Sequence, residues 1–381
     1  MVPRDVYAEL AVRHVINAAT TLTALGGTTL PDEVVAAMAS AATSCVSMEE
    51  LHLSVGRRVA ELTRNDAALV TAGAAAAICL GVLAAMTGGR PELIARLPAD
   101  ESLERRVIIH RAHRIPYDRA VELVGGHLVE IGNVIQTFEW ELSDALARGA
   151  AAVLWVAGDH LPATVLSLET TVRLARRHSV PVIVDAAAQL PPMSNLWRFT
   201  TECGADLALF SGGKALRGPQ ASGLLLGRAD LVEAARLNAA PLQRLARAMK
   251  VGKEEICGLW AALECYVALD HDEQARRWTA SVDSWVGLLQ DAEAACVRRV
   301  DTNEAGQPVA RLEVDCGSLE RSRAVASTLW EEDPRIAVLE VGRCVYVSPD
   351  VMDEVHHAYV IDRLRRALAT LGTEPGGNDV G

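Results

Sequence analysis

Short apolar runs alternate with helix-length amphipathic stretches over roughly the first two thirds of the chain. This alternation is typical of an α/β fold in which helices cover both faces of a mainly parallel sheet. We therefore expect a large domain at residues 20–246, with helices in segments such as 117–124, 139–148 and 168–178. Its seven expected strands are residues 67–70, 106–110, 127–131, 152–156, 181–184, 207–210 and 223–226.

The pattern changes after about residue 258, where longer helices are followed by two strand signals, at 309–314 and 343–347, and by a last helix near 352–371. We expect a linker helix and a small α+β domain at residues 247–371. Residues 1–19 are expected to pack on this small domain. The glycine-rich, polar tail, residues 372–381, is expected to be disordered.

Composition and charge narrow the possible partners. With 381 residues and half of them hydrophobic, the chain is large enough for two cores. A net charge of -12 argues against nucleic acid and against anionic membranes, so a small molecule is the expected partner. The start lacks the pattern of a secretory signal, which predicts a cytoplasmic protein. Residues 67–89 carry no charge, but their alanines and glycines favour a strand and a buried helix over a membrane span.

The chain is poor in lysine. Lys214, Lys250 and Lys253 are its only lysines, against 34 arginines. Arginine stays protonated and forms no useful imine, so only three residues are candidates for Schiff-base chemistry. A general compositional drift toward arginine would explain the scarcity without any chemistry. The eight cysteines form no CxxC pair and are expected to be reduced.

An apolar run ends at Asp185 in the segment VPVIVDAAAQ. A carboxylate at the end of a buried strand is costly unless it has a partner. The protonated ring nitrogen of pyridoxal 5'-phosphate (PLP) would be a suitable partner. Alternatively, Asp185 would cap the helix that AAAQ begins. This segment alone leaves both interpretations open.

A second strand runs out into Ser211, two glycines and Lys214 in ADLALFSGGKALRGPQASG. The glycines let the backbone approach a flat ligand, and the lysine could hold it as a Schiff base. One helix and one strand fit into the 29 residues from Asp185 to Lys214. Both side chains are therefore expected at neighbouring strand ends, where open α/β sheets bind ligands. The alternative is a solvated lysine beside a glycine turn.

A third strand breaks at Thr71, Ala72 and Gly73, and a helix follows from Ala74 in ALVTAGAAAAI. Free amides at the start of that helix, with the Thr71 hydroxyl, would bind a phosphate group. The segment is neither a Walker A loop nor GxGxxG, so nucleotide binding is disfavoured. The alternative is a helix that merely follows a strand.

Further candidates are weaker. His110 and His113 in HRAHRIP have no obvious third ligand, so no metal site is expected. His113 follows a strand end and could stack on the cofactor ring, or it could be an ordinary hydrogen-bonded loop histidine. Arg343 opens a C-terminal strand and is a candidate for pairing with a substrate carboxylate, although it is one of 34 arginines.

Taken together, these segments resemble the selenocysteine synthase (SelA)-like group of fold-type I PLP enzymes. That group contains L-seryl-tRNA(Sec) selenium transferase and D-glucosaminate-6-phosphate ammonia-lyase. The resemblance covers about residues 15–262 and rests on VINAATTLTALGG, SGGKALRGPQ and MKVGKEEI. It implies an aspartate aminotransferase-like fold, Lys214 as the Schiff-base lysine and Asp185 as the partner of the ring nitrogen. It also implies that Thr71, Gly73 and Ala74 form the phosphate loop.

The resemblance has further implications and some departures. It places Lys250 and Lys253 near the cofactor phosphate or an interface, and it implies a homodimer or larger homo-oligomer with shared active sites. Residues 26–29 and 48–52 are candidates to reach the neighbour's cofactor. Thr20 and Arg217 depart from glycines in relatives and are candidates to line the substrate pocket. The match begins at residue 15, so the tRNA-binding segment of the transferase is expected to be absent.

The implied chemistry starts when a substrate amine displaces Lys214, whose freed amine then removes the Cα proton. Elimination of a β-substituent from an amino acid or amino-sugar acid, as in an ammonia-lyase, ranks first. A transferase, a racemase or an aldol-type enzyme would use the same residues. An alternative of another class is a non-catalytic PLP-fold binding subunit, which the pairing of Lys214 with Asp185 disfavours.

Overall fold

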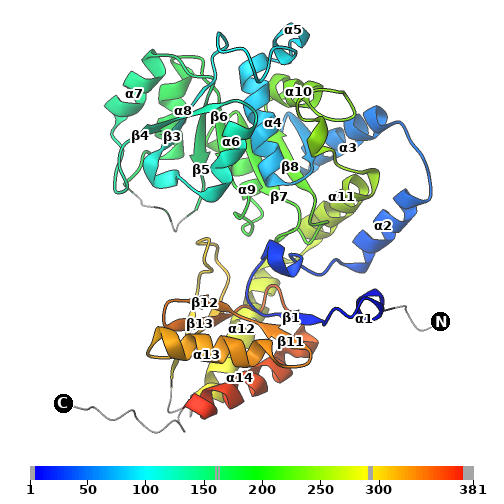
Figure 1. Cartoon of the computed structure of the whole chain (residues 1–381), viewed down its shortest axis with the longest axis vertical. Coiled ribbons are helices and arrows are strands. Elements are labelled where there is room, and N and C mark those ends of the chain that lie inside the picture. The colour runs from blue at the N-terminus through cyan, green and yellow to red at the C-terminus, as the bar shows by residue number, and fades with distance from the viewer. Residues whose placement is uncertain (1–4, 159–160, 162–163, 291–294, 372–381) are drawn as a thin grey trace. The chain divides into compact units, whose positions relative to one another are not determined.

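The computed structural model describes residues 5–158, 161, 164–290 and 295–371, and these form two compact units (Figure 1). The large unit comprises Thr29–Leu269 with Ala305–Gln307, and the small unit comprises Met1–Thr28, Asp270–Glu304 and Pro308–Gly381. The tail expected to be disordered, residues 372–381, lies outside the described residues. The domain boundaries drawn from the sequence stay a prediction.

The large unit is built on a seven-stranded sheet with the order β2-β8-β7-β6-β5-β3-β4. Strand β8 is antiparallel to both of its neighbours, β2 and β7, and the remaining pairs are parallel. Since β8 alone runs in the opposite direction, the carboxyl ends of all the other strands of this sheet lie at one edge. The mainly parallel α/β fold is thus confirmed. The strands are β2 (Ala67–Thr71), β3 (Arg106–His110), β4 (His127–Ile131), β5 (Ala152–Val156), β6 (Val182–Asp185), β7 (Leu207–Ser211) and β8 (Gly223–Gly227).

Both faces of this sheet are covered. In β3, Ile108 packs into one apolar cluster, whereas Val107 and Ile109 pack into the other, as the two-residue period of a strand requires. Helices α3, α7, α8 and α11 contribute to the first cluster, and α4, α6 and α10 to the second. The helices of this unit are α2 (Asp32–Ala42), α3 (Met48–Thr63), α4 (Ala74–Thr87), α5 (Pro91–Ile94), α6 (Arg119–Leu123), α7 (Glu139–Ala147), α8 (Leu168–Arg176), α9 (Asn195–Trp197), α10 (Ala229–Asn238) and α11 (Lys253–Ala268).

The uncharged run at residues 67–89 forms β2 and α4. Helix α4 is buried along most of its length, which explains why it is apolar on all sides. Within the described ranges, no helix is both long enough and apolar enough to cross a bilayer.

The small unit contains a four-stranded antiparallel sheet with the order β12-β13-β10-β9. Its core is formed by residues such as Leu312 and Val345 packing against the three long helices of the unit. Strand β1 pairs in parallel with β11. The elements are α1 (Val6–Glu9), β1 (Val15–Asn17), α12 (His271–Leu289), β9 (Cys296–Val300), β10 (Arg311–Asp315), α13 (Leu319–Trp330), β11 (Arg335–Ala337), β12 (Leu339–Val341), β13 (Cys344–Val347) and α14 (His357–Leu371).

The contact between α3 and β2 leaves no room for a side chain at Gly56, where a Cβ would lie 2.5 Å from the carbonyl oxygen of Ala68. We expect Gly56→Ala to destabilise the large unit by about 1–3 kcal/mol, because overpacking outweighs the gain in helix propensity. Gly287→Ala in α12 is the control, since a Cβ there would meet nothing within 4 Å. Urea unfolding followed by circular dichroism measures both; an unchanged midpoint for Gly56→Ala would contradict the packing argument.

Candidate active site

Polar residues end three strands of the large sheet at the same edge. Gly223, the first residue of β8, pairs with Thr71 of β2 on one side and with Ser211 of β7 on the other. Next to β7, Asp185 ends β6 and pairs with Val156, the last residue of β5. Open α/β sheets bind ligands beyond the carboxyl ends of their strands. The register therefore gathers the polar strand ends into one candidate site.

Asp185 is a buried carboxylate, with 5% of its surface exposed. Burial raises the pKa of Asp185 above its usual value, and the hydrogen bond from the Ala187 amide and the charge of Lys214 both oppose this effect. The Ala187 amide donates to Oδ1 at 3.0 Å. Asp185 and Lys214 are therefore close enough for their charges to interact. Because burial still dominates, this carboxylate would be stabilised by a further positive partner.

Lys214 lies in a tight turn after β7. The amide of Gly212 donates to the carbonyl of Ser222 at 2.8 Å, and the amide of Gly218 donates back to the carbonyl of Gly212 at 2.8 Å. These two bonds close the loop between β7 and β8 across its base. Lys214 itself is half-buried. The turn thus holds the lysine beyond the strand end and out of bulk solvent.

Arg217, at the end of the same turn, has a positive φ of 53°. Its Nε donates to the carbonyl of Thr29 at 3.0 Å, and its Nη2 donates to the Thr29 hydroxyl at 2.9 Å. Its amide donates to the carbonyl of Lys214 at 2.8 Å. The side chain therefore ties the segment before α2 to the Lys214 turn. A role for Arg217 in binding substrate stays a prediction.

Helix α4 begins directly beyond β2. Gly73 precedes it with a φ of 127°, a conformation that favours glycine, and no side chain caps the helix. Among the described residues, the amides of Ala74, Ala75 and Ala76 have no hydrogen-bond acceptor. A Cβ at Gly223 would lie 2.9 Å from the Ala74 nitrogen, so the helix start packs tightly on β8. Three free amides at a helix start form a seat for a phosphate group.

His113 is buried and its ring is fixed from three sides. Its Nδ1 accepts a hydrogen bond from the amide of Val156 at 3.2 Å, so the proton of the neutral ring is on Nε2. The rings of His110 and Trp155 meet it edge-on, at centroid distances of 4.9 and 5.3 Å. His113 thus lies at the end of β5, where Val156 pairs with Asp185, the last residue of β6. Stacking of His113 on a cofactor ring stays a prediction.

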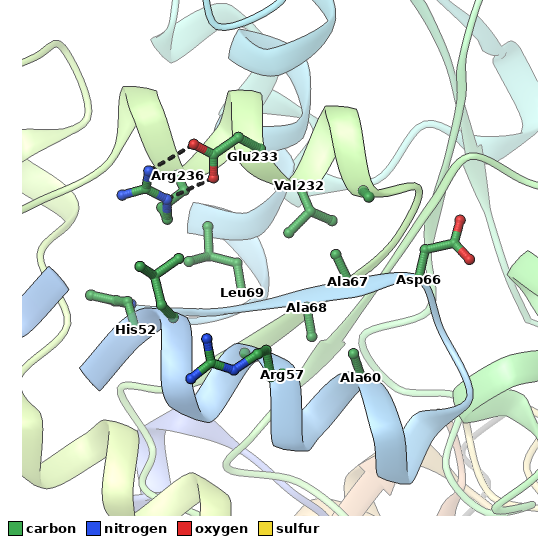
Figure 2. A pocket seen from close by; sticks show the side chains of 13 residues that line it. His52, Arg57, Ala60, Asp66, Ala67, Ala68, Leu69, Val232, Glu233 and Arg236 are labelled. Carbon is green, nitrogen blue, oxygen red and sulfur yellow. Dashed lines mark hydrogen bonds and ion pairs between the residues drawn. The ribbon is translucent and has the colours of Figure 1, made fainter. Parts of the chain in front are cut away.

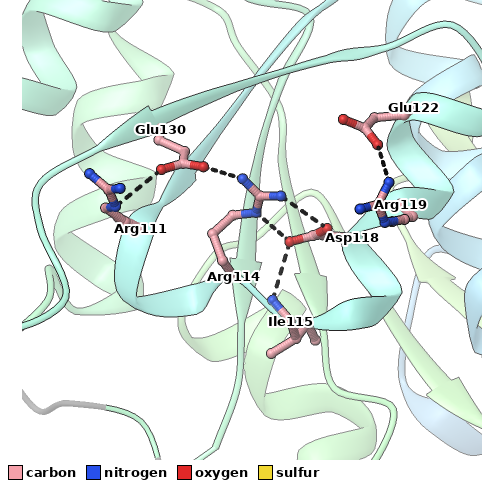
Figure 3. Close-up of polar contacts among 7 residues, drawn as sticks. All are labelled: Arg111, Arg114, Ile115, Asp118, Arg119, Glu122 and Glu130. Carbon is pink, nitrogen blue, oxygen red and sulfur yellow. Dashed lines mark hydrogen bonds and ion pairs between the residues drawn. The ribbon is translucent and has the colours of Figure 1, made fainter.

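The loop that carries His113 is held by charged contacts (Figure 3). Arg114 bridges the buried Asp118 and Glu130, and Asp118 also accepts from the Ile115 amide at 3.2 Å. Arg111 adds a contact to Glu130 at 3.4 Å. This network fixes the chain between β3 and α6, and with it the position of His113.

The residues at this edge fit PLP. The buried carboxylate of Asp185 lacks a sufficient positive partner, Lys214 offers an amine, and the start of α4 offers unpaired amides. These match the ring nitrogen, the aldehyde and the phosphate of PLP. The charges and donors of the site are thus complementary to the cofactor at three separate points.

Other residues singled out in the sequence lie in different contacts. The Lys253 Nζ donates to the carbonyl of Ala41 at 2.8 Å and pairs with Glu254. In the small unit, Arg343 pairs with Asp315 at 2.7 Å and its side chain is 64% exposed. The proposed roles of Lys253 at the cofactor and of Arg343 at the substrate stay predictions.

Thr20 belongs to a polar cluster of the small unit. Its hydroxyl donates to Glu304, which also pairs with the buried Arg311 at 3.2 Å. The Arg311 guanidinium stacks over Tyr346 at 4.2 Å. Burial and the negative charge of Glu304 raise the pKa of Asp350 to about 7. This cluster was not predicted from the sequence, because Arg311 carries no local signal that separates it from the other arginines.

Comparison with known proteins agrees with the chemistry of the site. The family model of L-seryl-tRNA selenium transferase matches residues 15–282. The chain belongs to the SelA family. Its family and its fold make it a PLP-dependent enzyme of fold type I, as the sequence predicted.

Individual SelA-like relatives have different activities. A 5'-C-glycyluridine monooxygenase-decarboxylase of a Streptomyces species is 33% identical over 97% of this chain and 94% of its own length. A D-glucosaminate-6-phosphate ammonia lyase of Salmonella typhimurium is 32% identical over 81% of this chain and 82% of its own. The solved structure of a D-glucosaminate-6-phosphate ammonia-lyase matches 98% of this chain and all of its own, with 28% identity and a TM-score of 0.83. A serine palmitoyltransferase of Sphingomonas wittichii, 14% identical with a TM-score of 0.61, shares the fold.

The environment of His110 in this SelA-family chain predicts a pH dependence of stability. Its ring is fully buried, its Nδ1 meets the Thr137 hydroxyl at 3.1 Å, and burial lowers its pKa from 6.5 to about 4. Between these pH values the unfolded chain binds the proton and the folded chain does not. Stability therefore falls as the pH drops from 6.5 to 4, by about 3 kcal/mol from this residue.

His110→Gln is expected to flatten the dependence of the urea midpoint on pH across this window. His127→Gln, at the exposed start of β4, is the matched control and should leave the slope as in the wild type. An identical slope in the His110 variant would show that His110 titrates normally.

Proposed function

We propose that this SelA-family enzyme is a lyase that removes the amino group of an amino acid or amino-sugar acid by α,β-elimination. The observation that carries the proposal is the closeness of Lys214 to the buried Asp185 at neighbouring strand ends. The similarity to an ammonia-lyase structure along nearly the whole of both chains supports this type of reaction.

In the proposed site, Lys214 holds PLP through its amine and Asp185 binds the ring nitrogen. Thr71, Ala72, Gly73 and Ala74 would hold the phosphate, with the first amides of α4 as donors. His113, Ser211 and Lys253 complete the cofactor contacts predicted from the sequence. The unpaired amides and the buried carboxylate support this assignment.

PLP supplies an electron sink that stabilises negative charge at Cα of the substrate. Lys214, released from the cofactor by the substrate amine, would take the proton from Cα with its free amine. Asp185, ionised, would hold a proton on the ring nitrogen. The turn closed by Gly212 and Gly218 keeps the lysine amine positioned during this transfer. Loss of a β-substituent and hydrolysis then release ammonia and a keto acid.

A second candidate is oxidative decarboxylation, because a monooxygenase-decarboxylase is similar to this chain along almost its whole length. Transferase, racemase and aldol-type reactions begin with the same residues and stay alternatives. A non-catalytic binding subunit would need neither the amine of Lys214 nor the carboxylate of Asp185. Arg343, from its place at the start of a C-terminal strand, and Arg217, from the resemblance, are the alternative candidates for the substrate carboxylate, and Thr20 is a further pocket candidate from the resemblance.

We also propose a cytoplasmic homodimer or larger homo-oligomer with shared active sites. The resemblance to the SelA-like group supports the oligomer. The eight free cysteines of the structure support a reducing compartment.

Borohydride reduction tests the cofactor assignment. The purified enzyme should show visible absorption that borohydride removes, and the cofactor should then be found by mass spectrometry on the peptide containing Lys214. Lys214→Ala should lose covalent attachment, because alanine has no amine. Lys250→Ala is the matched control and should behave like the wild type. Attachment to Lys250 or Lys253 would contradict the assignment, and a wild type that gains no absorption from added PLP would exclude the cofactor.

Product analysis tests the reaction type. A panel of amino acids and amino-sugar acids is incubated with the holoenzyme, and ammonia, carbon dioxide, oxygen uptake and deuterium at Cα are measured. The lyase proposal expects ammonia without oxygen uptake, and Lys214→Ala should reduce its rate by several orders of magnitude. Carbon dioxide with oxygen uptake would favour the monooxygenase-decarboxylase reaction. Deuterium exchange without ammonia would favour a racemase.

A further inference from the structure

Thr137 is buried at the end of a tight loop between β4 and α7, with 4% of its surface exposed. The loop begins at Gly132, whose φ is 71°, and a Cβ there would collide with the hydroxyl oxygen of Thr137. Asn133 closes the loop, because its Oδ1 accepts from the amides of Ile135 and Gln136 at 2.8 and 3.0 Å. The loop therefore fixes the Thr137 hydroxyl against the backbone that follows β4.

His110 contacts this hydroxyl from the end of β3. The Nδ1 of His110 lies 3.1 Å from the Oγ1 of Thr137, and its ring is fully buried. The Nε2 of the same ring has no hydrogen-bond partner among the described residues. An unpaired buried nitrogen has a cost that an apolar side chain would avoid. The hydrogen bond to Thr137 gives the ring a fixed rotation, which a ring without polar atoms would not have.

The oriented ring of His110 packs on His113. The two ring centroids lie 4.9 Å apart and their planes make an angle of 73°, an edge-to-face arrangement. A second edge-to-face contact comes from the indole of Trp155, at 5.3 Å and 85°. The indole Nε1 donates to the carbonyl of Leu166 at 3.2 Å. Each of these two neighbours of His113 is thus oriented by a hydrogen bond to a third residue.

The contact between the two histidines adds no charge to the candidate site near neutral pH. Burial lowers the pKa of His110 to about 4, so its ring is neutral there. The proton of the neutral His113 ring is on Nε2, because its Nδ1 accepts from the amide of Val156. His110 can therefore fix the plane of His113 without changing the electrostatics around it.

We propose that Thr137 and His110 position the ring of His113 for stacking on the cofactor. The hydroxyl of Thr137 orients the ring of His110, and this ring fixes the plane of His113. Neither positioning residue needs to touch the cofactor. The inference rests on the proposed function, which gives His113 its contact with PLP.

The variants Thr137→Ala and Thr137→Ser test the role of the hydroxyl, because both lose the methyl group and only alanine loses the oxygen. Each full-length apoenzyme is titrated with PLP, and the dissociation constant is taken from the visible absorption. Thr137→Ala should bind PLP about two- to tenfold more weakly than the wild type, the effect of losing one aromatic contact. Thr137→Ser should bind PLP like the wild type.

A double-mutant cycle tests whether Thr137 acts through His113. His113→Ala should weaken PLP binding at least as much as Thr137→Ala does. The double variant should then bind PLP no more weakly than His113→Ala alone. Losses that add independently would overturn the positioning role, since Thr137 would then affect the cofactor without His113.

Nitrogen NMR of the full-length enzyme with labelled histidine rings follows His113 without any catalysis. Its signals are recognised by their absence from His113→Ala. In the wild type they should report one tautomer, with the proton on Nε2. Thr137→Ala should shift or broaden these signals, and Thr137→Ser should leave them unchanged.

Gly56→Ala is the control for a general loss of stability. It perturbs the contact between α3 and β2, which Figure 2 shows with Ala60 on the helix and Ala68 on the strand. Four strands of the sheet separate β2 from β3. This variant should lower the urea midpoint and leave the His113 signals as in the wild type.

The outcomes separate this inference from the proposed function. Unchanged His113 signals in Thr137→Ala, or a PLP affinity equal to that of Thr137→Ser, would overturn the positioning role and leave the assignment of Lys214 intact. A wild type that takes up no PLP would overturn the proposed function and this inference together.

Discussion

The candidate site depends on one costly group, the carboxylate of Asp185 at the buried end of β6. Burial raises the pKa of this residue, and the nearby charge of Lys214 compensates only in part. An isolated buried carboxylate would destabilise the fold. The structure keeps it where the neighbouring strand ends in a turn that carries an amine. A cofactor with a protonatable ring nitrogen would supply the missing compensation, so in the proposed assignment the costly carboxylate is also the group that holds the PLP ring.

The direction of β8 determines where the phosphate seat lies. Because β8 is antiparallel to both neighbours, β2 runs in the same direction as β7 and ends at the same edge. Gly223 then packs between Thr71 and Ser211, and its missing side chain lets the start of α4 approach the sheet. If β8 were parallel to its neighbours, it would carry the same residues. Its first residue would then no longer lie between the last residues of β2 and β7. The reversed direction of β8 therefore brings the proposed phosphate seat to the edge where β6 and β7 end.

The sequence predicted the large sheet well, because buried parallel strands are continuous apolar runs. Strands β3, β4 and β5 have the predicted bounds, whereas β2, β6 and β7 end one residue later than predicted, at Thr71, Asp185 and Ser211, and β6 also begins one residue later. The polar side chains of these three residues predicted that the strands end before them. Backbone pairing does not depend on the side chain, and it continues through these residues. The antiparallel β8, the anchoring of Arg217 by Thr29 and the proton position on His113 were not predictable, because each depends on contacts between distant segments.

The difference between local sequence signals and contacts between distant segments also explains why the site identifies the cofactor more firmly than the substrate. In the proposed site, Lys214 and Asp185 would act on the part of the reaction that PLP enzymes share, the removal of a proton or group from Cα. The SelA-like relatives are named as a lyase, a transferase and a monooxygenase-decarboxylase, so this common step is compatible with several outcomes. Discrimination between these reactions must come from the residues that bind the rest of the substrate. The Nε and Nη2 of Arg217 already donate to Thr29, so a substrate carboxylate would have to use the other donors of this guanidinium, and its side chain is a structural tie first.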